Sequence, residues 1–223
     1  MLDHLVKVCC ISSLDEARLA TKLGADLLGL VSEMPSGPGV ISLDLIAEIV
    51  AGLPADTRSV LLTSKTNSDD IISQHEKVQT WGLQLVDSVS VVELKKLRSK
   101  LPGTQLIQAI HIQGKASLNE ALAVTGLVDF LLLDSGSPKA PVKTLGGTGQ
   151  IHDWNLSQEI CDQSSIPVLL AGGLTPRNVA TAIQKVQPAG VDLCSGVRTA
   201  GQLDPDKLSS FMNMVHQQDR LSQ

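Results

Sequence analysis

The sequence predicts one α/β domain that folds as a closed (β/α)₈ barrel over residues 1–223, and three observations support this. Short apolar runs rich in Val, Ile and Leu alternate eight times with segments of helical periodicity. The length of 223 residues lies within the ~200–250 residues that such barrels commonly have. Hydrophobic residues make up 43% of the chain but aromatic residues only 2%, so the core must be aliphatic, as barrel interiors are.

The first strand–helix unit shows the pattern that the others repeat. Residues 6–11 form the first expected strand. Ser13 follows as a helix N-cap, and Asp15 and Glu16 in the first turn interact favourably with the helix dipole. Gly24 is placed to end this helix as a C-cap. A strand, a loop, a capped helix and a glycine thus follow one another within some twenty residues.

Seven more units follow along the chain. The remaining strands are expected at residues 27–32, 59–63, 83–86, 106–112, 130–134, 168–171 and 191–194. The remaining helices are expected at residues 42–51, 69–78, 89–99, 117–124, 155–161, 176–183 and 205–216. Continuous apolar strands of this kind are typical of parallel sheets covered on both faces. The prediction is therefore a TIM barrel. The alternative is an open doubly wound sheet, which normally carries an early glycine-rich fingerprint that this chain lacks.

Composition excludes several classes of protein. The net charge of −5 with interspersed charges argues against a nucleic-acid partner. No apolar run approaches the ~20 residues that span a membrane, and no signal peptide is visible. The four cysteines form no CxxC pair and no histidine pair has metal-ligand spacing, so we expect neither a metal site nor a disulfide. A reducing cytoplasm is the simplest location.

Two glycine-containing loops predict a phosphate site. Gly172 and Gly173 follow the seventh strand, and Ser195 and Gly196 follow the eighth. In barrels of this class the loops after these two strands commonly bind phosphate, because glycine lets backbone N–H groups approach the anion closely. The alternative is that these glycines only make tight turns. Their occurrence at both positions favours phosphate binding.

An acid and a base are expected at the same end of the barrel. Cys9 lies at the end of the first strand and Asp134 at the end of the sixth. A thiolate can remove a proton from carbon and a carboxylic acid can protonate a leaving oxygen, so the two could catalyse an isomerisation. Alternatively, Cys9 is a small buried hydrophobic residue and Asp134 a cap. Cys10 would face away from Cys9 on a strand, and Lys7 would lie inside the barrel, paired with a carboxylate.

Several motifs resemble the phosphoribosylanthranilate isomerase family of tryptophan biosynthesis over nearly the whole chain. The motifs are Val6 to Ser12, Leu132-Leu133-Asp134-Ser135, Gly146-Gly147-Thr148-Gly149 before Asp153-Trp154, Leu170 to Val179, and Ser195-Gly196-Val197. The resemblance implies an Amadori rearrangement, an aldose-to-ketose shift, with Cys9 as general base and Asp134 as general acid. It adds Gly147 and Gly149 to the expected phosphate-binding residues and implies no cofactor or metal.

Four residues depart from the family pattern. Cys10 replaces a glycine, Gly39 an arginine that contacts the aryl carboxylate, Val86 a histidine, and Arg198 a glutamate. Losing one charge-assisted contact would cost about 1.5–3 kcal/mol of affinity. We expect Gly39, Val86 and Arg198 to lie near the substrate, although for Arg198 a solvated surface position is slightly favoured.

His111, at the end of the fifth strand, could also contact the substrate. A lone histidine is, however, more often a hydrogen-bonded structural residue than a functional one.

Three functions remain compatible with the sequence. The first is an isomerase of the phosphoribosylanthranilate class, and the second is a related isomerase of another phosphorylated sugar amine. The third is a non-catalytic barrel that binds a phosphorylated ligand. In each case the partner is a small phosphorylated molecule, with no nucleic acid, no membrane and no cofactor, and the chain is a monomer or a homodimer.

Overall fold

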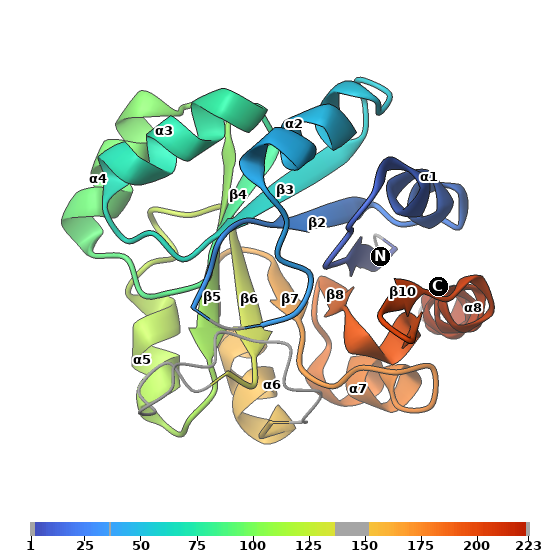
Figure 1. The fold of residues 1–223 in the computed structure, drawn as a ribbon. Helices are drawn as coiled ribbons and strands as arrows, with labels where there is room; N and C mark the ends of the chain where they lie inside the picture. Colours follow the sequence, from blue (N-terminus) through green and yellow to red (C-terminus); the bar gives the residue numbers. More distant parts are fainter. Residues whose placement is uncertain (1–2, 36, 137–151, 222–223) are drawn as a thin grey trace.

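A computed structural model describes residues 3–35, 37–136 and 152–221 and shows a closed eight-stranded parallel barrel (Figure 1). The barrel strands are β1 (Leu5–Val8), β2 (Leu27–Val31), β3 (Arg58–Thr63), β4 (Gly82–Leu85), β5 (Gln105–His111), β6 (Phe130–Asp134), β7 (Val168–Leu170) and β8 (Gly190–Leu193). Each strand pairs with the next, and β8 pairs with β1 to close the barrel. The predicted fold is confirmed, and the open sheet is excluded.

Helices cover the outside of the barrel, as Figure 1 shows. They are α1 (Leu14–Lys22), α2 (Leu43–Ala51), α3 (Ser68–Val78), α4 (Val91–Lys100), α5 (Ala116–Leu122), α6 (Trp154–Gln163), α7 (Val179–Val186) and α8 (Pro205–Leu221). Ser13 caps α1 as predicted, because its hydroxyl accepts a hydrogen bond from the N–H of Glu16. Gly24 then has a φ of +101°, which ends the helix at little steric cost.

Several expected boundaries differ from the structure, such as the last helix, which runs to Leu221 rather than to residue 216, and two of the differences have a visible backbone cause. The helix expected from residue 176 begins at Val179, because Thr175 to Asn178 form a turn in which the carbonyl of Thr175 accepts from the N–H of Asn178. The expected strand 6–11 ends at Val8, although the N–H of Cys9 still donates to the carbonyl of Leu193 on β8. Cys10 takes a φ of +63° and bends the chain out of the strand.

One segment was not anticipated. After β8 the chain forms a short 3₁₀ helix, η1 (Ser195–Val197), and a small hairpin of β9 (Arg198–Thr199) and β10 (Gln202–Leu203) before α8. A backbone hydrogen bond from the N–H of Asp204 to the carbonyl of Val197 closes this hairpin against η1. The hairpin holds the residues that follow β8 beside the carboxyl end of β1.

Strand alternation divides the core into two layers. Residues that face outward from the strands pack against the helices in one large apolar cluster. The inward residues form a smaller aliphatic cluster that includes Leu27, Val60, Ile107, Leu132 and Leu169. Lys7 is fully buried in the interior, and its Nζ lies 2.8 Å from Oδ1 of Asp192 on β8. The predicted interior lysine–carboxylate pair is confirmed.

Candidate functional site

The carboxyl end of the barrel gathers most of the residues that the sequence singled out. Cys9, Val86 and Ala171 belong to the inward cluster and lie just past the ends of β1, β4 and β7. His111 and Asp134 are the last residues of β5 and β6 and pair with each other in register. Alternation along both strands directs these two side chains inward as well. The barrel therefore brings the expected base and acid to one end, where such barrels carry their active sites.

The thiol of Cys9 is buried next to a cation. The side chains of Cys9 and Lys7 both lie against Gly29 on β2. A Cβ at Gly29 would be 2.9 Å from Sγ of Cys9 and 3.1 Å from Nζ of Lys7. The absence of a side chain at Gly29 thus makes the space that both groups occupy. Lys7 remains charged there, because Asp192 raises its pKa even though burial lowers it.

These surroundings favour the thiolate form of Cys9. The hydrogen bond with Cys10 lowers the pKa of the Cys9 thiol most, and the positive charge of Lys7 lowers it further. Burial and the Asp192 carboxylate act in the opposite direction, but the net pKa is below the ordinary thiol value. The pKa of Cys10 is raised, first by its hydrogen bond with Cys194 and then by that with Cys9. Of the two neighbours, Cys9 is the thiol that ionises.

The carboxylate of Asp134 is held by the residue that follows it. Its Oδ1 accepts a hydrogen bond of 2.7 Å from the N–H of Ser135, and the side chain is half-buried. His152, just before α6, lies close enough to feel the charge of Asp134. Burial lowers the pKa of His152 more than Asp134 and Asp153 raise it, so the neutral imidazole is favoured. No sequence pattern marked His152, because its proximity to Asp134 is a tertiary contact between residues that periodicity does not relate.

Cys10 does not face away from Cys9 as a strand would require. Its left-handed φ of +63° ends the strand, and both sulfur-bearing side chains join the inward cluster. A non-glycine residue in this region is uncommon and is strained by roughly 1–2 kcal/mol. The glycine that the family has at this position would adopt the same backbone freely. The prediction of opposite faces was therefore wrong, although Cys9 and Cys10 are both free thiols as expected.

Gly39 lies directly against Cys10. The loop between β2 and α2 folds back over the end of β1, so that Sγ of Cys10 lies 3.6 Å from the carbonyl oxygen of Pro38. A Cβ at Gly39 would be 2.5 Å from Cβ of Cys10, and Gly39 itself has a φ of +77°. The place where the family pattern has arginine thus has no room for a side chain while Cys10 is present.

The loops after β7 and β8 meet, as a shared phosphate site would require. Gly172 and Gly173 have φ values of +83° and +63°, so both use conformations that favour glycine. Asn178 fixes this loop, because its Nδ2 donates to the carbonyl of Gly173. A Cβ at Gly196 would lie only 2.0 Å from the carbonyl oxygen of Leu174, so the two loops are in backbone contact. Gly147 and Gly149 lie outside the described residues.

The imidazole of His111 contacts the backbone carbonyl of Val86. Val86 is buried at the end of β4, and Nε2 of His111 lies 2.9 Å from its carbonyl oxygen. His111 is itself buried. The side chain at position 86 offers no polar atom, but a histidine from the neighbouring strand lies over the same strand end.

Arg198 is neither solvated nor free. Its side chain is 9% exposed, and its Nη1 lies 2.9 Å from Oε1 of Glu16 on α1. Nη2 also donates to the carbonyl oxygens of Cys9 and Cys10. The guanidinium thus ties the hairpin after β8 to the residues that follow β1. The expectation of a surface arginine was wrong. Its charge is already paired with Glu16, which the sequence marked only as an acid in the first turn of a helix.

The described ranges hold no group of three or more His, Cys, Asp or Glu side chains placed to bind a metal ion. Within the same ranges, no helix has both the length and the apolar composition to cross a membrane.

Comparison with known proteins places this geometry in a family. A sequence profile described as N-(5'-phosphoribosyl)anthranilate (PRA) isomerase matches residues 6–214. N-(5'-phosphoribosyl)anthranilate isomerase 1 of Methanosarcina mazei is 35% identical over 227 residues, covering 96% of this chain and 95% of its own length. The isomerase of Methanocella arvoryzae is 34% identical over 192 residues, covering 86% of this chain and 88% of its own length.

Solved structures agree with the sequence comparison. Phosphoribosyl anthranilate isomerase from Thermotoga maritima superposes with a TM-score of 0.82 at 27% identity, over 96% of this chain and 99% of that one. A family member in complex with reduced 1-(o-carboxyphenylamino)-1-deoxyribulose 5-phosphate gives a TM-score of 0.79 at 25% identity, over 96% and 99% of the two chains.

A third structure shows monomers of the dimeric phosphoribosylanthranilate isomerase from Thermotoga maritima, at 25% identity and a TM-score of 0.79, over 96% of this chain and 99% of that one. With a profile match over most of its length and relatives at 34–35% identity across most of both sequences, this chain belongs to the N-(5'-phosphoribosyl)anthranilate isomerase family.

Proposed function

We propose that this protein is a phosphoribosylanthranilate isomerase of tryptophan biosynthesis in which Cys9 is the general base and Asp134 the general acid. The observation that carries the proposal is the buried Cys9 thiol beside Lys7, at the same end of the barrel as Asp134. A base that removes a proton from carbon must be ionised at neutral pH, and the surroundings of Cys9 lower its pKa. Its relatives bear the name of this activity.

The reaction divides between the two residues. Asp134 donates its proton to the ring oxygen of the ribosylamine as the bond from that oxygen to C1 breaks, leaving an open-chain iminium at C1. The Cys9 thiolate then removes the proton from C2, and the electron pair moves to form the enol-enamine. A proton added to C1 and the loss of the proton from the C2 hydroxyl then turn the enol-enamine into the ketose. Each group finishes with the opposite protonation state, so proton exchange with solvent restores both.

The loops after β7 and β8 are proposed to hold the phosphate. Gly172, Gly173, Ser195 and Gly196 are brought together by the backbone contact between the two loops. Glycine conformations there let N–H groups turn towards an anion without a side chain in the way. Gly147 and Gly149 are proposed as further phosphate contacts on the strength of the family resemblance. Binding at this end would place the sugar between Cys9 and Asp134.

Activity measurements on matched variants test the proposal. Freshly prepared phosphoribosylanthranilate is mixed with the protein and the fall of its fluorescence is followed. Cys9→Ala and Asp134→Asn should each lower kcat about 10²–10⁴-fold. Both variants should still bind reduced 1-(o-carboxyphenylamino)-1-deoxyribulose 5-phosphate, which is called the reduced product analogue below. Cys161→Ala, at a cysteine on α6 away from the barrel mouth, should leave the rate unchanged. Wild-type protein that binds the analogue without turning substrate over would establish a non-catalytic barrel instead.

One observation favours a second candidate, an isomerase of another phosphorylated sugar amine. Gly39 is packed against Cys10 and Val86 is aliphatic, so neither can bind an aryl carboxylate through its side chain. Binding of reduced product analogues with and without the ring carboxylate separates the candidates. A carboxylate that improves affinity at least tenfold, equivalent to ~1.4 kcal/mol, supports the anthranilate substrate. Equal affinities support the other substrate.

A further inference from the structure

His111 has one nitrogen that is fixed and one that is free. Nε2 lies 2.9 Å from the carbonyl oxygen of Val86, and a carbonyl can only accept a hydrogen bond. Nε2 must therefore carry a proton. In the neutral imidazole the other nitrogen, Nδ1, then has a lone pair and no hydrogen. The bond to Val86 thus sets both the orientation and the tautomer of the ring.

Nδ1 is buried without a partner. Across the described residues it makes no hydrogen bond, and the histidine is 8% exposed. Native proteins leave few buried acceptors unsatisfied, because each unmade hydrogen bond is costly. Such an atom at the carboxyl end of a barrel strand indicates that its partner arrives with a ligand. For the neutral imidazole, that partner is a hydrogen-bond donor.

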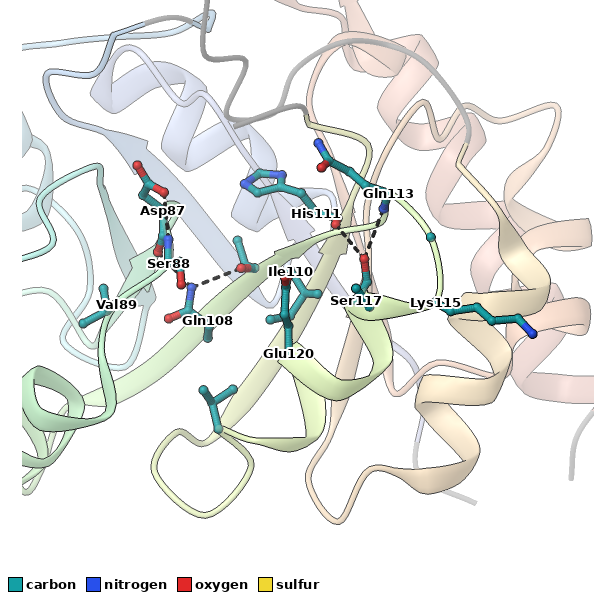
Figure 2. Close-up of a pocket in the computed structure, with 14 residues that line it drawn as sticks. Asp87, Ser88, Val89, Gln108, Ile110, His111, Gln113, Lys115, Ser117 and Glu120 are labelled. Atoms are coloured by element: carbon teal, nitrogen blue, oxygen red, sulfur yellow. Dashed lines mark hydrogen bonds between the residues drawn. The ribbon is translucent and has the colours of Figure 1, made fainter. Parts of the chain in front are cut away.

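The position of the ring fits this role. His111 is the register partner of Asp134, so the acceptor stands on the strand next to the proposed acid. A cavity of about 610 Å³ borders His111, but its lining includes Ile110, Glu120 and Val124 and so lies on the outward side of β5. Figure 2 shows the imidazole at the end of β5, pointing away from the side chain of Ile110. The unsatisfied acceptor therefore faces the barrel interior beside Asp134, where the proposed substrate would bind, and not the outer cavity.

We propose that Nδ1 of His111 accepts a hydrogen bond from a hydroxyl of the sugar-phosphate substrate and so helps to select it. This inference rests on the proposed function and adds a specificity-determining residue to it. The chemistry excludes the anionic parts of the ligand as partners, because ionised phosphate and carboxylate groups have no proton to donate to a neutral Nδ1. A sugar hydroxyl supplies the donor. The contact would orient the sugar beside Asp134 before the ring opens.

Nitrogen NMR of the histidine ring tests the inference without a variant. In the free wild-type protein the Nδ1 resonance of His111 should be that of an unprotonated nitrogen. Adding the reduced product analogue should shift it in the direction of an accepted hydrogen bond, whereas inorganic phosphate should leave it unchanged. A protonated Nδ1 in the free protein, or an unchanged resonance in a saturated analogue complex, would overturn the proposal.

Binding calorimetry adds a second measurement. His111→Leu removes the acceptor, and His111→Asn keeps an oxygen near the position of Nδ1. The analogue should bind His111→Leu about tenfold more weakly than wild type and His111→Asn with intermediate affinity, while inorganic phosphate binds all three alike. Equal analogue affinity in folded wild type and His111→Leu refutes the role of His111 alone. An analogue that binds none of the three refutes the proposed function along with it.

Discussion

Gly39→Ala should destabilise the protein by about 2–5 kcal/mol. Two terms add up to this range. The φ of +77° is a left-handed conformation that costs an L-residue with a side chain roughly 1–2 kcal/mol. The new Cβ would lie 2.5 Å from Cβ of Cys10, well inside the ~3.5–4.0 Å of ordinary carbon contacts. Overpacking of this kind costs about 1–3 kcal/mol.

Gly37→Ala is the matched control in the same loop. Gly37 has a φ of +119°, but a Cβ there would meet no atom within 4 Å. It should therefore lose only the backbone component, about 1–2 kcal/mol. Urea unfolding followed by far-ultraviolet circular dichroism measures the free energy of unfolding of both variants. The difference between them reports the overlap with Cys10.

A double variant tests whether Cys10 causes the loss. Cys10→Gly removes Cβ and Sγ, two of the three atoms that Gly39→Ala would crowd, and relieves the left-handed strain at residue 10, although the Cα of residue 10 stays 2.9 Å from the new Cβ. The double variant Cys10→Gly/Gly39→Ala should recover about 1–2 kcal/mol relative to the sum of the single effects. If Gly39→Ala costs no more than Gly37→Ala, or if the two substitutions add without coupling, the packing argument is wrong.

Three further predictions follow from the ion pairs and the loops. Glu16→Gln should cost about 1.5–3 kcal/mol, because it leaves the largely buried Arg198 without its carboxylate. Burial raises the pKa of Glu16, but Arg198 and backbone N–H groups lower it further, so the net pKa in the folded protein is below the ordinary value. The stability that the ion pair contributes is therefore complete above about pH 4.3, the ordinary pKa of Glu, and is lost as the pH falls through the lower pKa of the folded state. Acid titration of wild-type stability should show this loss, and Glu16→Gln should lack it. Lys7→Met should raise the pKa of Cys9, because it removes the positive charge beside the thiol. Alkylation of Cys9 at neutral pH, followed by mass spectrometry, should then become slower. An unchanged alkylation rate would show that Lys7 does not stabilise the thiolate. Gly196→Ala should push the loops after β7 and β8 apart and weaken inorganic phosphate binding at least tenfold by calorimetry, and undiminished binding would move the phosphate site elsewhere.

Local patterns in the sequence were enough to predict the barrel and the ends of its strands. Apolar periodicity depends on backbone conformation and burial, so it located all eight strand–helix units and directed Lys7, Asp134 and His111 inward. Side-chain caps act within a few residues, so Ser13 was recognisable as the start of α1. The turn at Thr175 to Asn178 was missed, because proline is compatible with both a turn and the first turn of a helix.

The tertiary structure decided which of these residues touch. Cys10 shares the interior with Cys9 because the loop after β2 and the residues after β8 close over the end of β1, and strand alternation does not describe a bent backbone. The partners Glu16 and Arg198 lie 182 residues apart. The free nitrogen of His111 depends on the carbonyl of Val86, 25 residues away. Periodicity reports the surroundings of one segment, whereas these contacts exist only where distant segments meet at the barrel mouth.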